Sequence, residues 1–142
     1  MGALTMTKQE REDFLAEGHV GVLAVNADDA PVVTPIWYSY EPGGDIVVTT
    51  GTATSKAKAL RTAGRASLCV QTEAAPYQYV VVEGPVTLSD GVDSHWRRDL
   101  ARRYLGEVLG DAYYDSTMEH EKTAVTVRLT PETWRTTDYN KL

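Results

Sequence analysis

The chain has 142 residues, of which 42% are hydrophobic and 24% charged, and its formal net charge is −6. This composition is that of an ordinary globular protein, so we expect a single domain over residues 1–142 that buries about 70% of its unfolded surface. The negative net charge argues against a nucleic-acid-binding face. No apolar run is long enough for a membrane span, and the charged segment KQERED near the start lacks the apolar core of a signal peptide. We therefore expect a cytoplasmic protein with no nucleic-acid or membrane partner.

The first elements form a helix followed by antiparallel strands. Thr7 and Glu10 have capping-box spacing and Gly18 is placed as a stop, which predicts a helix over residues 7–17. Alternating apolar residues then predict strands over 19–25, 31–40 and 45–50, separated by turn residues around 27–29 and 41–44.

The next segment is free of acidic residues, although the protein is acidic overall. No Asp or Glu occurs between Asp45 and Glu73, and this window contains Lys56, Lys58, Arg61 and Arg65. Ala53, Ala57 and Leu60 recur at helical spacing, Thr52 or Thr54 provides a cap, and Gly64 a stop.

Lysine at the start of this helix is opposed by the helix dipole, whereas free N–H groups, hydroxyls and lysines together suit a phosphate. The window therefore predicts an anion site at Lys56. Because residues two apart point in nearly opposite directions on a helix, Lys58 would meet the anion from a neighbouring face. The alternative is that both lysines are solvated surface charges.

The second half predicts strands over 65–72 and 77–88, with Gly84-Pro85 bending the second of these. Residues 94–109 read as a helix with a buried stripe of Trp96, Leu100, Tyr104 and Val108 and a solvated arginine face. A short helical piece over 113–121, a strand over 123–129 and a polar tail follow. Six short strands with helices at intervals indicate a mostly β (α+β) barrel.

Few residues have the spacing that catalysis requires. The three histidines are far apart, so no metal site is predicted; no Gly-x-Ser-x-Gly motif occurs, and the single cysteine, Cys69, excludes an internal disulfide. Trp37 faces one side of its strand, and Tyr38 and Tyr40 face the other. Core packing is the ordinary role for most of these rings, but one of the two faces could form the wall of a site for a flat ring. A flavin or deazaflavin, which has a phosphate and a flat ring and brings its own hydride chemistry, fits this pattern.

Five segments, GVLAV, PVVTPIWYSYEPGGDIVVTTG, TSKAKALR, GRASLCV and YVVVEGPVTL, resemble the pyridoxamine 5′-phosphate oxidase-like family. The resemblance covers about residues 19–88 and is strongest to the branch of F420-dependent (deazaflavin) oxidoreductases. It implies a six-stranded antiparallel split β-barrel and a homodimer with cofactor sites at the subunit interface.

The resemblance also implies which residues hold the cofactor. Those expected at the phosphate are Thr54, Ser55, Lys56 and Lys58. Those expected at the ring, on the second and third strands, are Thr34, Pro35, Ile36, Trp37 and Thr50. Tyr79, within residues 77–79, or Trp134 would reach the partner's site.

Two departures from the oxidase pattern bear on the function. No Arg or Lys occurs between Arg11 and Lys56, which favours F420 over FMN. The C-terminal Arg and His that would bind vitamin B6 have no counterpart, which argues against vitamin B6 oxidation. Arg61 is the candidate for the oligoglutamate tail of F420, followed by Arg97, Arg98 and Arg102. We expect F420-dependent hydride transfer to a flat conjugated substrate; the alternatives are an FMN-binding oxidase or reductase and a non-catalytic cofactor carrier. The sequence identifies no catalytic residue.

Overall fold

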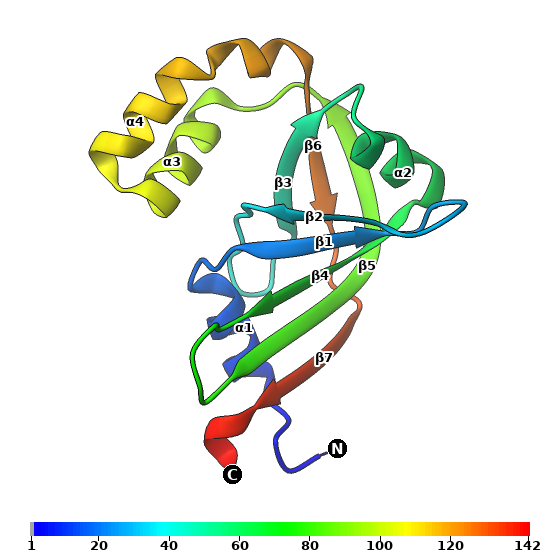
Figure 1. The fold of residues 1–142 in the computed structure, drawn as a ribbon, viewed down its shortest axis with the longest axis vertical. Coiled ribbons are helices and arrows are strands. Elements are labelled where there is room, and N and C mark those ends of the chain that lie inside the picture. Colours follow the sequence, from blue (N-terminus) through cyan, green and yellow to red (C-terminus); the bar gives the residue numbers. More distant parts are fainter. Residues whose placement is uncertain (1) are drawn as a thin grey trace.

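Residues 2–142, which the computed structural model describes, form a curved antiparallel sheet of seven strands with helices around it (Figure 1). The strand order is β2-β1-β4-β5-β6-β3, and β7 pairs with β5 outside this order. The strands are β1 (Gly21–Val25), β2 (Val32–Ile36), β3 (Ile46–Gly51), β4 (Arg65–Gln71), β5 (Gln78–Asp90), β6 (Ala124–Leu129) and β7 (Thr133–Asp138).

Strand β5 belongs to both halves of the sheet. Its first half lies between β4 and β7, and from Val86 onward it pairs with β6. The change of partner occurs at Gly84 and Pro85, where the sequence predicts a bend. A Cβ atom on Gly84 would collide with the carbonyl oxygen of Thr130, so glycine is required where these two segments cross.

A single bridge between Ser39 and Val47 links the segment after β2 to β3, at the other end of the strand order. The six strands of the order β2-β1-β4-β5-β6-β3 therefore curl around one core as a split β-barrel. The predicted fold class is confirmed. The predicted strand over 31–40 is shorter than expected, because regular pairing with β1 ends at Ile36.

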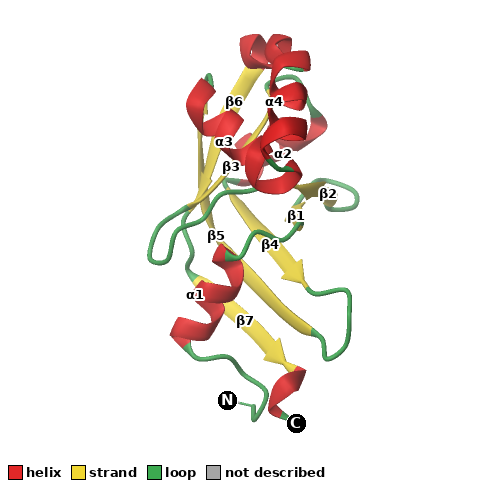
Figure 2. Cartoon of the chain, turned by 90° about the vertical axis from the view of Figure 1, so that its left-hand side faces the viewer, coloured by secondary structure: helices red, strands yellow, loops and turns green. Residues whose placement is uncertain are grey.

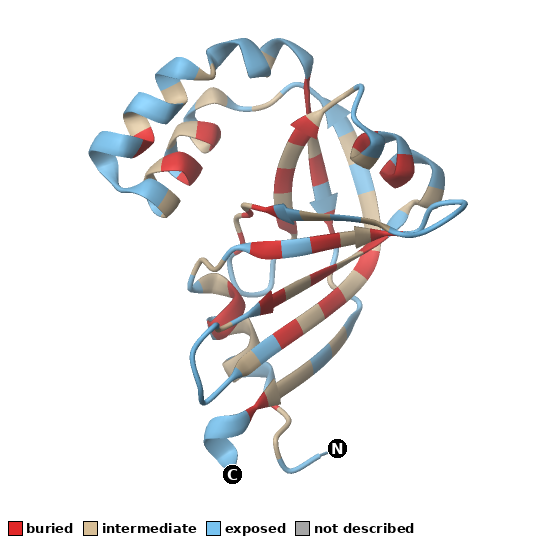
Figure 3. Cartoon of the chain, in the orientation of Figure 1, coloured by how far each residue is buried: buried red, intermediate tan, exposed pale blue. Residues whose placement is uncertain are grey.

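The barrel core is completed by two short helices, α1 (Lys8–Ala16) and α2 (Ser55–Ala63). Phe14 and Leu15 from α1 and Leu60 from α2 are buried against the inward faces of both sheet halves (Figure 3). The predicted capping box is present: Thr7 Oγ1 accepts from Glu10 N, and Glu10 Oε1 accepts from Thr7 N. Tyr38 is fully buried and its hydroxyl donates to the Leu15 carbonyl at 2.6 Å, which ties the segment after β2 to α1.

The prediction of one helix over 94–109 is wrong. Helix α3 (Ser94–Leu105) ends at Gly106, whose φ of +83° reverses the chain, and α4 (Glu107–Ser116) then packs back against α3. Gly110 allows this close packing, because a Cβ there would lie 2.6 Å from Arg102 Cα. Val108 consequently lies on the outside, 82% exposed, instead of in a buried stripe.

The α3–α4 hairpin and the following η1 (Met118–Thr123) lie at the end of the molecule opposite the two termini (Figures 1 and 2). None of the helices within residues 2–142 has the length and apolar character needed to cross a membrane.

The C-terminal segment, predicted to be a polar tail, is instead the edge strand β7 followed by η2 (Tyr139–Lys141). It pairs with β5 along its whole length, and Trp134 turns inward against the core, with the Arg11 guanidinium 4.6 Å from its ring centroid. The prediction failed because a strand with one apolar residue among threonines has little hydrophobic periodicity.

Candidate functional site

A cavity of about 560 Å³ opens between the end of the barrel and the α3–α4 hairpin. Strand β2 and the residue after it provide Pro35, Ile36 and Trp37, and the end of β3 provides Thr50 and Gly51. The opposite wall comes from the helical side of the chain: Arg97, Leu100, Tyr113 and His120. Parts of the chain that are far apart in sequence therefore form one site.

Aromatic rings from the two walls of this cavity pack against each other. Trp37 stacks on Tyr104, with ring centroids 4.9 Å apart and planes 3° from parallel, and Tyr113 is tilted against Trp37 with centroids 5.3 Å apart. The Tyr104 hydroxyl donates to the His19 carbonyl at 2.8 Å and accepts from Tyr38 N at 3.2 Å. Burial raises the pKa of this hydroxyl, which therefore stays protonated and holds the wall in place.

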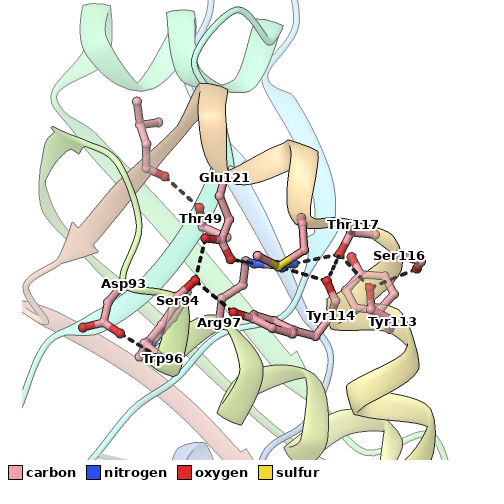
Figure 4. Close-up of polar contacts among 12 residues, drawn as sticks. Thr49, Asp93, Ser94, Trp96, Arg97, Tyr113, Tyr114, Ser116, Thr117 and Glu121 are labelled. Atoms are coloured by element: carbon pink, nitrogen blue, oxygen red, sulfur yellow. Dashed lines mark hydrogen bonds and ion pairs between the residues drawn. The ribbon is translucent and has the colours of Figure 1, made fainter.

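Arg97 anchors the helical wall (Figure 4). Its side chain is only 7% exposed; Nε donates to Glu121 Oε2 at 2.6 Å, Nη1 to Thr117 Oγ1 at 2.7 Å and Nη2 to the Tyr114 carbonyl at 2.9 Å. Hydrogen bonds from Ser94 and Arg97 lower the pKa of the Glu121 carboxyl. The expectation that Arg97 is solvated is wrong, because the hairpin brings Glu121, 24 residues further along the chain, onto it.

The other candidate arginines do not line the cavity, and two of them bind within the chain. Arg61 donates to the Thr52 carbonyl at 2.9 Å and to its hydroxyl at 2.7 Å, and Arg102 pairs with Asp111 at 2.6 Å. Arg98 is half-buried, with no hydrogen-bond partner for its Nε among the described residues. Arg61 thus supports the loop that leads into α2.

The N-terminus of α2 adjoins the cavity through two hydroxyls. Thr50 lines the cavity, and its Oγ1 lies 3.2 Å from Oγ1 of Thr54, the N-cap residue, which accepts from Ala57 N. The N–H groups of Ser55 and Lys56 have no acceptor within the helix, as expected for a first turn. The predicted capped helix is therefore present and ends at Gly64.

Lys56 and Lys58 differ in their surroundings. Lys56 is half-buried and burial lowers its pKa, whereas Lys58 is exposed. Neither lysine forms an ion pair within residues 2–142. A phosphate at this helix end would favour the charged form of Lys56 and so oppose the effect of burial on its pKa.

The structure brings together some of the predicted site residues. Pro35, Ile36, Trp37 and Thr50 line the cavity, and Thr54, Ser55 and Lys56 lie at the adjoining start of α2. Thr34, on β2, pairs with Leu23 of β1 and does not line the cavity. Tyr79, on β5, is 37% exposed. Sequence reasoning named Arg97 only as a secondary candidate for the cofactor tail. The cavity residues that it missed, for which no local motif exists, are Val20, Thr49, Gly51, Leu100, Tyr113, His120, Thr123 and Ala124.

Residues 7–138 match the model of the pyridoxamine 5′-phosphate oxidase family. The chain belongs to this family. No curated protein is similar enough in sequence to count as a match.

Solved structures show the same fold in several proteins of low sequence identity. A conserved hypothetical protein from Mycobacterium tuberculosis is 23% identical with a TM-score of 0.78, over 99% of this chain and 90% of its own. A structure described as an F420 reductase is 21% identical with a TM-score of 0.72, over 87% of this chain and 94% of its own. An FAD-binding protein from Mesorhizobium loti is 22% identical with a TM-score of 0.66, over 93% of each chain.

The residues present fit a phosphorylated cofactor with a flat ring. The cavity volume of about 560 Å³ lies within the range of small-molecule sites. Trp37 and Tyr113 give the cavity an aromatic lining. The α2 N-terminus with Lys56 offers N–H groups and a positive charge a short way along the chain from Thr50.

Proposed function

We propose that this protein binds F420 and acts as an F420-dependent oxidoreductase on flat conjugated organic substrates. The observation that carries the proposal is the continuity between the cavity and the α2 N-terminus, through the contact of Thr50 with Thr54. The ring would lie along Pro35, Ile36 and Trp37, and the phosphate would bind at Thr54, Ser55 and Lys56, with Lys58 at its margin. When bound, reduced F420 supplies the hydride.

The absence of Arg and Lys from the strands ahead of α2 favours F420 over FMN. No Arg or Lys occurs between Arg11 and Lys56, so the strands ahead of the helix provide no second lysine or arginine for an FMN phosphate. The similar fold of an F420 reductase supports the same choice, while that of an FAD-binding protein keeps a flavin as the alternative.

A homodimer belongs to this proposal, because the cavity opens beside an uncovered apolar face. Pro35 pairs with Val22, Val22 with Cys69, and Cys69 with Val81, which forms a row across the outward side of the sheet. Val20 and Pro35 line the cavity and are exposed on this side. A second copy seated on the row would cover this apolar surface and complete the rim of the cavity, with Tyr79 at its edge.

Titration of the purified protein with F420 and FMN tests the proposal. F420 fluorescence should change with micromolar-range affinity, FMN should bind at least tenfold more weakly, and the protein should migrate as a dimer in analytical ultracentrifugation. A protein that copurifies with yellow FMN and does not bind F420 would establish the flavin alternative. Binding of F420 with no oxidation of its reduced form by any enone or quinone would establish the carrier alternative.

A further inference from the structure

Reduction of a conjugated acceptor consumes one hydride and one proton. If the proposed function holds, the cofactor supplies the hydride, and the proton must come from the protein or from water. The groups that border the cavity therefore decide whether the chain has its own acid.

Three of the cavity-lining side chains carry an ionisable group: Arg97, Tyr113 and His120. A guanidinium does not release its proton in proteins, and that of Arg97 is bonded to Glu121, Thr117 and Tyr114. A tyrosine phenol ordinarily ionises near pH 10, well above neutral pH. Imidazole is the side chain that ordinarily exchanges its proton between about pH 5 and 8.

His120 is held at the cavity by its backbone. It lies in η1, and its N–H donates to the Thr117 carbonyl at 3.0 Å. The Arg97–Glu121 ion pair fixes the next residue along the chain. The imidazole itself makes no hydrogen bond within residues 2–142 and is exposed, so that it can be reprotonated from water.

The charged groups near His120 are already paired with one another. Glu119 accepts from Lys122 at 3.0 Å, and Glu121 binds Arg97 at 2.6 Å. Tyr113, on α4, is the other ionisable group that borders the cavity beside them. No carboxylate of the described chain therefore competes for the His120 proton by a direct bond.

We propose that His120 is the proton donor of the reductive reaction. As the acceptor carbon gains a hydride from the reduced deazaflavin, the electron pair of the conjugated double bond moves to the carbonyl oxygen or the α-carbon. The imidazolium N–H bond breaks and its proton forms the new O–H or C–H bond there. The acceptor gains two electrons and two hydrogens, the deazaflavin loses a hydride, and His120 becomes neutral and is recharged by water.

The first test measures the position of His120 without turnover. The imidazole NMR signals are assigned with His120→Gln and His95→Gln; His95 is exposed on α3 and does not line the cavity. Addition of oxidised F420, or of menadione as a flat quinone, should shift the His120 signal and leave that of His95 unchanged. If F420 binds by fluorescence and neither compound moves the His120 signal, the proposal is overturned.

The second test measures reduction of menadione and of 2-cyclohexen-1-one by reduced F420. His120→Gln should lower kcat about 100-fold, within the usual range for loss of a general acid, and leave the Kd of F420 within twofold of wild type. His95→Gln should behave as wild type in both measurements. Equal kcat values for wild type and His120→Gln would overturn the proposal.

The two proposals fail in different ways. Absence of F420 binding by the wild type refutes the proposed function. Binding of F420 by the wild type without turnover of either acceptor establishes the carrier alternative and refutes the oxidoreductase activity itself. Turnover by the wild type with an unchanged kcat in His120→Gln refutes the role of His120 alone and leaves the proposed function in place.

Discussion

Trp37 and Tyr104 stack with planes 3° from parallel, so the residue that follows β2 and the third turn of α3 form one rigid surface. Residue Trp37 presents this surface to the cavity, while the Tyr104 hydroxyl binds the barrel through the His19 carbonyl. The two residues therefore have separable roles: Trp37 borders the cavity, and Tyr104 links the hairpin to the barrel.

Substitutions of this pair should separate ligand binding from stability. Trp37→Leu removes the aromatic face and should weaken F420 binding about tenfold. Tyr104→Phe keeps the stack and should leave affinity within twofold, but it should lower the free energy of unfolding by about 1–3 kcal/mol because buried polar partners lose the hydroxyl. Fluorescence titration and urea denaturation measure the two effects. Equal affinity losses in both variants would contradict this division.

Lys56 is the cationic group that we expect to bind the cofactor phosphate. A charged hydrogen bond is worth about 1.5–3 kcal/mol, so Lys56→Met should weaken F420 binding roughly ten- to a hundredfold. Its melting temperature should hardly change, because the helix dipole opposes this cation and its aliphatic stem is retained. Lys58→Met, on the exposed face, is the matched control and should show a smaller loss. Unchanged affinity in both variants would place the phosphate elsewhere.

Glu121 should make the helical wall sensitive to acid. Its pKa is lowered by Ser94 and Arg97, so its stabilising contribution is complete above the ordinary glutamate value of 4.5 and is lost as the pH falls below it. Glu121→Gln should lower the melting temperature by roughly 3–10 °C at pH 7. Thermal scans should show this difference from wild type shrinking below pH 4.5. A difference that stays constant down to pH 3 would show that the ion pair is not the cause.

Tyr38 should have the opposite pH dependence. Burial raises the pKa of its hydroxyl, so the neutral form stabilises the fold fully below pH 10, and this contribution is lost as the pH rises above 10. Tyr38→Phe leaves the Leu15 carbonyl without its donor and should cost about 1–3 kcal/mol at pH 7. Urea denaturation should show the cost diminishing above pH 10. Tyr139→Phe, whose ring is 41% exposed, is the control and should have no effect.

Gly84→Ala should be severely destabilising, because its methyl group would collide with the Thr130 carbonyl. We expect a loss of about 3 kcal/mol or more, since backbone on both sides must shift. Gly43→Ala is the matched control: it meets open space and bears only the strain of its φ of +86°, about 1–2 kcal/mol. Urea denaturation of both variants checks this, and equal losses would argue against the crossing of the two segments.

The features that could be predicted from the sequence are those encoded by neighbouring residues. The capping box of Thr7 and Glu10 and the cap and stop of α2 at Thr54 and Gly64 depend on local spacing, and all are present. The residues expected at the cofactor ring were predicted from a family resemblance. This resemblance covers strands in which apolar and polar residues alternate clearly.

The rest depends on contacts between distant segments. Arg97 reads as a surface charge until the chain reversal at Gly106 brings Glu121 against it. His120 enters the cavity by the same reversal, and β7 becomes a strand only because β5 offers it an edge. No window of neighbouring residues contains this information.

The sharing of β5 between both halves of the sheet has a consequence for how the molecule opens. Neither half can separate without breaking the ladder of the strand that joins them, so the barrel should unfold as one cooperative unit. Val80 and Val82 are fully buried in the first half of that strand, between β4 and β7. Their backbone amides should then exchange with deuterium only through global unfolding, while those of the α3–α4 hairpin exchange through smaller local openings.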